Sequence, residues 1–290
     1  MGNEVMIESL YRDGFCKIEQ VFSKDFIHQL RVECLRISDA LPMQLRNKYR
    51  SQGSLVQLLD YPYFSTLIAH DNLFDCFQRL RFTDTVFSSG YLISKPPGGP
   101  PLFWHQDWWG WDHPSSYTST IAQFFVMIYL QKTDKTNGCL RIIPGSHREP
   151  FEQLSSLDAH TDELSAYSDP QSIQFEDIDQ GVAVEVEIGD IVVGDARLLH
   201  GAYANHSDLE RSLLTLWYHP NYGDLPDSVR SAIWRMHNGI ADGVDTPISE
   251  GGITAWPTSE KQMVLPITPR REEKAPLEWN RTPQWAKKLP

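Results

Sequence analysis

The sequence predicts a mainly β protein with flanking helices, whose strands form an antiparallel sandwich or barrel. From about residue 84 onward, short runs rich in β-branched and aromatic residues alternate with Gly, Pro, Asn and Asp. The run VAVEVEIGDIVVGD at 182–195 is the clearest, because its valines alternate with Ala and Glu. No long helical patterns separate most of these runs, which argues against the βαβ units of a parallel sheet.

Helical periodicity is confined mainly to the first 83 residues. We expect a short helix over 3–13 and a strand in GFCKIEQVF at 14–22. Ser23 provides an N-cap for a longer helix over about 24–41. Its apolar residues recur on one face and form a buried stripe: Leu30, Cys34, Ile37 and Leu41. A further helix is expected over 72–81, opened by Asp71 or Asn72.

The β runs define a core over about 84–220. They are TVFSSGYLISK, IAQFFVMIYLQ, CLRIIPG, VAVEVEIGDIVVGD and RSLLTLWYHP. Within the fourth run, Gly189 and Asp190 are expected to form a tight hairpin turn that leads into another strand.

A mixed C-terminal part is expected to cover this core. DLPDSVRSAIWRMHNG predicts a helix over 224–239 that stops at Gly239, and the last fifty residues are expected to wrap the surface irregularly. Because no linker is visible, we expect a single domain over 1–290. It comprises a helical part at about 1–83, the core at about 84–220 and the cover at about 221–290.

Composition narrows the class of protein. The net charge of -12 disfavours binding to nucleic acid or to anionic lipid surfaces. No signal peptide and no apolar stretch of about 18 residues is visible, so no membrane association is expected. The four cysteines show no CxxC spacing, as expected of reduced thiols in a cytoplasmic protein. A small molecule is therefore the expected partner.

The stretch LFWHQDWWGW at 102–111 places polar residues among tryptophans. His105 and Asp107 are two residues apart, so in an extended strand they share one face. His200 lies at the end of, or just after, another strand, and Arg211 follows eleven residues later at the start of the next strand. We expect these two strands to be antiparallel neighbours, which would place Arg211 close to His200. Two histidines and one carboxylate form the facial triad of non-haem Fe(II) oxygenases, which leaves three coordination positions open for a keto acid and O2. An arginine such as Arg211 suits the second carboxylate of a keto diacid.

Several segments together resemble the phytanoyl-CoA dioxygenase family of Fe(II)/2-oxoglutarate-dependent oxygenases, over roughly 10–220. These segments are LYRDGFCKIEQVFSKDFIHQLR, LISKPPG, HQD, TDKTNGCLRIIPGSHR and GDARLLHGAYANHSDLERSLL. The resemblance implies a double-stranded β-helix, a jelly-roll and cupin-like core. It also implies Fe(II) on His105, Asp107 and His200, with 2-oxoglutarate as cosubstrate, its distal carboxylate on Arg211, and O2 as oxidant.

The resemblance implies further contacts around the cosubstrate. Lys95 matches a family lysine near it, with a surface lysine as the alternative. Gln123 and Met127, four residues apart on one strand, share a face and are expected to contact 2-oxoglutarate. Met127 stands at a Trp-like position, and Ala202 stands where family members sometimes carry a hydroxyl. Related halogenases lack the metal carboxylate, so Asp107 disfavours halogenation.

The tryptophans have two interpretations. Trp104 and Gln106 are expected to point away from the metal face, and Trp104 to pack in the core. Beyond the metal motif, Trp108, Trp109 and Trp111 are expected at the mouth of the pocket, where they would contact an apolar or ring-bearing substrate.

The expected function is hydroxylation of an unactivated C–H bond in a small organic metabolite of a biosynthetic pathway, coupled to conversion of 2-oxoglutarate and O2 to succinate and CO2. Desaturation, epoxidation and cyclisation are alternative outcomes of the same iron chemistry. A non-catalytic jelly-roll binding protein and a cupin-like hydrolase or isomerase are further alternatives. A CoA thioester is disfavoured, because the chain offers only the basic run at 46–50 to its phosphates.

Overall fold

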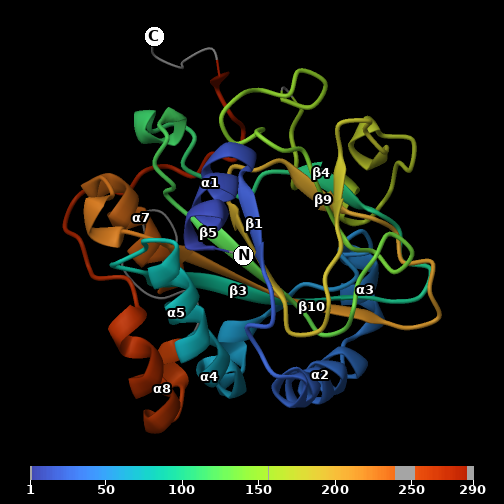
Figure 1. Ribbon diagram of the computed structural model, residues 1–290, viewed down its shortest axis with the longest axis horizontal. Coiled ribbons are helices and arrows are strands. Elements are labelled where there is room, and N and C mark those ends of the chain that lie inside the picture. Colours follow the sequence, from blue (N-terminus) through green and yellow to red (C-terminus); the bar gives the residue numbers. More distant parts are fainter. Residues whose placement is uncertain (1, 156, 239–251, 286–290) are drawn as a thin grey trace.

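Two antiparallel sheets face each other in the computed structural model, which describes residues 2–155, 157–238 and 252–285. The larger sheet has the order β1-β8-β5-β10-β3-β2, and the smaller has the order β4-β9-β6-β7. The strands are β1 (Phe15–Ile18), β2 (Val56–Gln57), β3 (Val86–Lys95), β4 (Leu102–His105), β5 (Phe124–Tyr129), β6 (Leu140–Ile142), β7 (Val182–Val184), β8 (Ile191–Asp195), β9 (His200–Ala202) and β10 (Arg211–His219). This arrangement (Figure 1) confirms the mainly β fold with flanking helices and a jelly-roll core.

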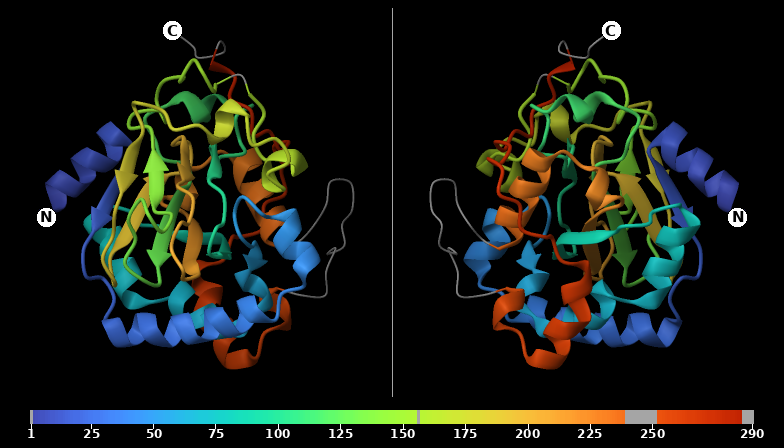
Figure 2. Two further views of the ribbon diagram at one scale, coloured as in Figure 1. Left: turned by 90° about the vertical axis from the view of Figure 1, so that its right-hand side faces the viewer. Right: turned by 90° about the vertical axis from the view of Figure 1, so that its left-hand side faces the viewer.

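Helices gather on the outside of this sandwich. They are α1 (Asn3–Asp13), α2 (Lys24–Asp39), α3 (Met43–Lys48), α4 (Ser65–Ile68), α5 (Asp71–Arg79), α6 (Asp162–Ser165), α7 (Asp227–His237) and α8 (Thr258–Val264). Short 3-10 turns lie at 58–60, 62–64, 114–117, 173–175, 222–224, 253–255 and 265–267. Figure 2 shows α2 running along the end of the molecule where α4 and α8 also lie.

The caps explain where two of these helices begin. The Ser23 hydroxyl accepts a hydrogen bond from the backbone N–H of Phe26, which confirms the predicted cap of α2. The helix predicted over 72–81 is present as α5, but the prediction of its cap was wrong, because neither Asp71 nor Asn72 caps it. Instead, the ring of His70 accepts a hydrogen bond from the backbone N–H of Asn72.

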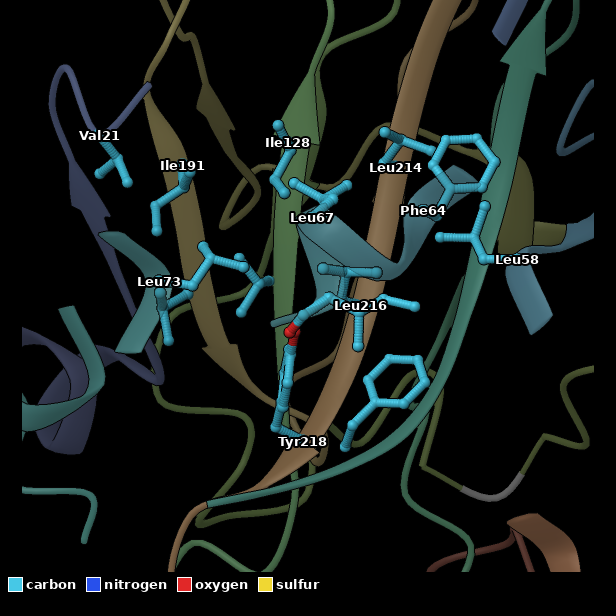
Figure 3. Close-up of a cluster of buried hydrophobic side chains, with 14 of the residues drawn as sticks. Val21, Leu58, Phe64, Leu67, Leu73, Ile128, Ile191, Leu214, Leu216 and Tyr218 are labelled. Atoms are coloured by element: carbon cyan, nitrogen blue, oxygen red, sulfur yellow. The ribbon is translucent and has the colours of Figure 1, made fainter. Parts of the chain in front are cut away.

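Strand β5 is apolar on both faces because one face packs against the helices and the other packs against the smaller sheet. Phe124, Val126 and Ile128 belong to the cluster that joins the larger sheet to α2, α4 and α5. Phe125, Met127 and Tyr129 alternate with them and pack toward β6 and β7 of the smaller sheet. Figure 3 shows the helix-facing cluster, with Leu67 beside Leu214 and Leu216 of β10.

The tight hairpin predicted within VAVEVEIGDIVVGD is wrong in its pairing. A turn is present, and Gly189 has a φ of +96°, where a side chain would be strained. However, β7 pairs with β6 in the smaller sheet, whereas β8 pairs with β1 and β5 in the larger sheet. The chain therefore crosses between the layers at this turn, and local sequence does not distinguish such a crossing from a hairpin.

The C-terminal cover is more regular than predicted. The helix predicted over 224–239 is α7 over Asp227–His237, and its predicted stop at Gly239 lies outside the described residues. Helix α8 and two 3-10 turns lie within the segment expected to be irregular. In the described part of the chain, no helix combines the length and apolar character that a membrane span requires.

We expect Leu216→Ala to lower the free energy of unfolding by about 2–5 kcal/mol, because the truncation leaves a cavity between β10 and the helical layer. Leu216 is fully buried in that layer. Urea denaturation followed by circular dichroism measures the change. Val32→Ala is the control, since Val32 is 57% exposed and its loss should cost less than about 0.5 kcal/mol. Equal losses for the two variants would contradict the assigned core.

Candidate active site

Two histidines lie side by side on adjacent strands of the smaller sheet. His105 is the last residue of β4 and His200 the first of β9, and the two are direct partners in the antiparallel register. Their ring centroids are 4.2 Å apart, and both side chains are buried. Cross-strand partners project from the same face of a sheet, so both rings point into the space between the sheets.

Backbone carbonyls fix the tautomers of both rings. His105 Nδ1 is 2.9 Å from the Phe103 carbonyl, and His200 Nδ1 is 2.9 Å from the Leu198 carbonyl. Because a carbonyl only accepts, each Nδ1 carries the hydrogen and each Nε2 keeps its lone pair. Such bonds orient metal-binding histidines.

Asp107 joins the two histidines, although not as predicted from a continuous strand. Strand β4 ends at His105, and the chain then turns so that the backbone N–H of Asp107 donates to the Ala196 carbonyl at 2.8 Å. The Asp107 carboxylate places Oδ1 3.5 Å from His105 Nε2 and Oδ2 3.5 Å from His200 Nε2. The indole N–H of Trp217 donates to Oδ2 at 3.0 Å.

The charges of this cluster suit a cation. Burial, reinforced by His105, lowers the pKa of His200 to about 4, so its ring is neutral at pH 7. Burial alone would raise the pKa of Asp107, yet His200 and His105 hold it well below its usual range. The His200 ring is thus ready to donate a lone pair and the carboxylate is charged, which is the state that a metal requires.

The three side chains fit a divalent metal. Their ligand atoms all lie within 4.8 Å of one another. Two imidazole nitrogens and one carboxylate oxygen on one side of an ion match the 2-His-1-carboxylate set of non-haem Fe(II) sites. The cluster thus brings together the three residues that the sequence predicted as ligands.

A cavity of about 430 Å³ opens onto these three residues. Four residues expected to contact cosubstrate or substrate line it: Arg211, Gln123, Met127 and Trp109. Ala202, the position without a hydroxyl, also lines it. Five residues that the sequence did not single out complete the polar and aromatic wall: Tyr129, His160, Trp217, Trp279 and Arg281.

Arg211 is a buried cation whose donors lack partners. It is 2% exposed, and its Nε and Nη1 have no hydrogen-bond partner. Burial lowers its pKa, while the nearby Tyr129 ring, 5.7 Å from the guanidinium carbon, favours the charge. It reaches the cavity from β10 of the larger sheet, so it faces His200 from the opposite layer instead of lying on a neighbouring strand as expected.

Lys95 does not line the cavity. Its side chain is fully buried, and its Nζ donates to the carbonyls of Ser51 and Pro100. The surface interpretation was therefore wrong, whereas a place near the cosubstrate stays a prediction. It ties the loops before β2 and β4 together, next to Arg211, its partner in the β3–β10 register.

Of the tryptophans in LFWHQDWWGW, the structure places fewer at the cavity, and more in the core, than the sequence predicted. Trp108 and Trp111 are fully buried against α7 and do not line the cavity, so we no longer expect them to contact substrate. The Trp108 indole donates to the Ser116 hydroxyl at 2.8 Å. Trp109 lines the cavity and stacks on Trp279. Trp104 packs in the core as expected, and Gln106 turns away from the metal face to bond the Arg197 carbonyl.

Two of the cavity-lining residues that the sequence did not single out could have been predicted from strand alternation. Tyr129 follows Met127 by two residues on β5, and Trp217 follows Arg211 by six on β10, so period-two alternation places each on the cavity face. His160, Trp279 and Arg281 lie in loops without periodic pattern. Only the folded chain brings them to the cavity.

Comparisons with known proteins agree with this geometry. A family model described as phytanoyl-CoA dioxygenase (PhyH) matches residues 10–213. The chain is 25% identical over 219 residues to a probable alpha-ketoglutarate-dependent hypophosphite dioxygenase of Stutzerimonas stutzeri, which spans 71% of this chain and 74% of that protein. It is 30% identical over 165 residues to phytanoyl-CoA dioxygenase 1 of Oryza sativa subsp. japonica, which spans 57% of this chain and 55% of that protein.

A solved structure shares the fold. The epimerase SnoN, in complex with Fe3+, alpha ketoglutarate and nogalamycin RO, superposes with a TM-score of 0.56 at 16% identity, covering 86% of this chain and 94% of that chain. At this identity the likeness concerns the fold alone.

We expect Trp217→Phe to weaken Co(II) binding about 10–100-fold, because the variant lacks the hydrogen bond that orients Asp107 Oδ2. Anaerobic titration with Co(II), followed by visible absorption, measures the affinity. Trp256→Phe is a matched control, since it deletes a buried indole bond to the Leu59 carbonyl, far along the chain from the cluster. Equal Co(II) affinity in both variants would show that Trp217 does not position the carboxylate.

Proposed function

The chain belongs to the phytanoyl-CoA dioxygenase family, and from this premise we propose that it oxidises an unactivated C–H bond of a small organic molecule, with Fe(II), 2-oxoglutarate and O2. Hydroxylation is the outcome we propose, with desaturation, epoxidation and cyclisation as variants of the same chemistry. The substrate is a metabolite of a size that the cavity can enclose.

The observation that carries this proposal is the pairing of the His-Asp-His cluster with Arg211 in one cavity. A metal site alone would also suit a hydrolase or an isomerase. A buried guanidinium with two unpaired donors calls for an anionic partner, since an uncompensated buried charge is costly. 2-Oxoglutarate supplies that partner, because it chelates a metal at its keto acid end and carries a second carboxylate at the other end.

The residues present fit both groups. His105, Asp107 and His200 would hold the iron, and Arg211, supported by Tyr129, would hold the distal carboxylate of 2-oxoglutarate. Gln123 and Met127 would flank the cosubstrate from the larger sheet. When bound, the iron and 2-oxoglutarate supply the oxidising power, through oxidative decarboxylation of 2-oxoglutarate by O2.

The protein itself positions the reactants and keeps water out. The carbonyl-anchored rings of His105 and His200 and the Trp217-bound carboxylate hold the metal ligands in place before any ligand arrives. The cavity wall is largely apolar, with Leu55, Leu59, Ile93 and Leu213 among its residues. Such a wall excludes water and favours the carbon skeleton of an organic substrate.

We expect the purified protein, with Fe(II) under anaerobic conditions, to bind 2-oxoglutarate and develop the weak visible charge-transfer absorption of the chelate. Arg211→Met should weaken 2-oxoglutarate binding about 100-fold or more, because it removes the buried partner of the distal carboxylate. It should leave Co(II) affinity within threefold of wild type, since Arg211 is not a metal ligand. Arg36→Gln, an exposed arginine on α2, controls for the lost charge.

The alternatives give other results. A non-catalytic binding protein would form the chelate and release no succinate when O2 is admitted. A hydrolase or isomerase would bind the metal and show no response to 2-oxoglutarate. Absence of the absorption in the wild-type protein would overturn the proposed function.

A further inference from the structure

The C-terminal segment contributes two residues to the lining of the cavity. The backbone of Asn280 is bonded on both sides to the loop that follows the metal motif: its N–H donates to the Trp109 carbonyl at 2.8 Å, and its carbonyl accepts from Trp111. Trp279 and Arg281 flank this anchored residue, and both line the cavity. The segment therefore holds a ring and a guanidinium in place at the substrate space.

His160 fixes the direction of the Arg281 guanidinium. His160 Nε2 is 2.9 Å from the Gln106 carbonyl, and its Nδ1 is 2.8 Å from Arg281 Nη1. Since a carbonyl only accepts and a guanidinium only donates, Nε2 carries the hydrogen and Nδ1 accepts. His160 has a φ of 63°, in a region that residues other than glycine seldom adopt and that is enriched at functional sites.

Arg281 keeps donors free for a ligand. Its Nε is buried and has no hydrogen-bond partner, and in the described part of the chain its one hydrogen-bonded neighbour is the neutral ring of His160. The guanidinium lies 4.8 Å from the Trp279 ring, which supports a cation without neutralising it. No carboxylate of the described residues is within ion-pair distance of it.

Arg281 and Arg211 serve different regions of the cavity. Arg281 bonds His160, whose ring lies 5.0 Å from the ring of His105, whereas Arg211 lies over the ring of Tyr129 and beside Lys95 on the neighbouring strand. Arg281 is thus linked to the metal cluster through His160, and it also lies over Trp279, which is 49% exposed. One cosubstrate has one distal carboxylate, so the second guanidinium is left for another anion.

We propose that Arg281 binds a carboxylate or phosphoryl group of the substrate, so that the substrate class is anionic small molecules. This rests on the proposed function. The stacked pair of Trp109 and Trp279, with ring centroids 5.4 Å apart, then borders the carbon skeleton. Holding the anionic group at Arg281 sets which carbon of the substrate lies beside the metal cluster.

The test uses protein loaded with Ni(II) and 2-oxoglutarate, and three probes that share a phenyl ring: phenylacetate, phenylphosphonate and the neutral phenylacetamide. Binding is followed by quenching of tryptophan fluorescence. We expect at least one anion to bind ten times more tightly than the amide. Arg281→Gln should abolish that preference, Arg281→Lys should restore part of it, and the exposed control Arg36→Gln should keep it.

The outcomes separate the possible roles of Arg281. Preference for phenylacetate assigns a carboxylate substrate, and preference for phenylphosphonate assigns a phosphoryl substrate. Equal responses to all three probes, including no response, overturn the proposal. It is also overturned if Arg281→Gln weakens 2-oxoglutarate as much as the probe, since the residue would then serve the cosubstrate. Failure of wild-type protein to bind 2-oxoglutarate without any probe is a separate result that would refute the proposed function.

Discussion

The register between β4 and β9 is the constraint on which the rest of the site depends. It sets His105 opposite His200, and in each strand the ring bonds the carbonyl two residues earlier. The same hydrogen bond from ring Nδ1 to a backbone carbonyl therefore orients both histidines, and it leaves their two Nε2 lone pairs directed at one point. Because a register shift of one residue would turn one ring to the other face, sheet pairing and metal binding select the same arrangement.

Asp107 lies beyond the strand and needs support of its own. That support comes from the turn between β8 and β9, where the Ala196 carbonyl accepts the N–H groups of Asp107 and Trp108. The turn is held by a buried ion pair in which Arg197 bonds both oxygens of Asp195, at 3.0 and 2.6 Å. Its remaining guanidinium donors reach the carbonyls of Ser116 and Thr118. With every partner satisfied, this buried pair fixes the backbone that carries the third ligand.

Sequence reasoning succeeded where the chemistry is local or periodic. Motif spacing and the family resemblance identified the triad and Arg211, although Asp107 lies beyond its strand and Arg211 lies in the opposite layer. The cavity face of β5 follows from alternation, and the cap at Ser23 follows from residue type. It failed where the decisive partner is distant in the chain. Nothing local tells that VAVEVEIGDIVVGD divides between two sheets, that Lys95 finds two carbonyls in the interior, or that α7 covers Trp108 and Trp111. Arg281 enters the cavity because Asn280 bonds the loop after the metal motif, a contact spanning about 170 residues.

The charge balance of the cavity differs from that of the chain. The chain as a whole has a net charge of -12, whereas the cavity lining holds two guanidiniums and Asp107 as its one carboxylate among the described residues. An iron dication and a dianionic cosubstrate would cancel each other, so with both bound, the two arginines and Asp107 leave one positive charge uncompensated. In a space that excludes water, such a charge is costly. A substrate with a single negative charge would remove that cost, and a neutral substrate would leave it in place.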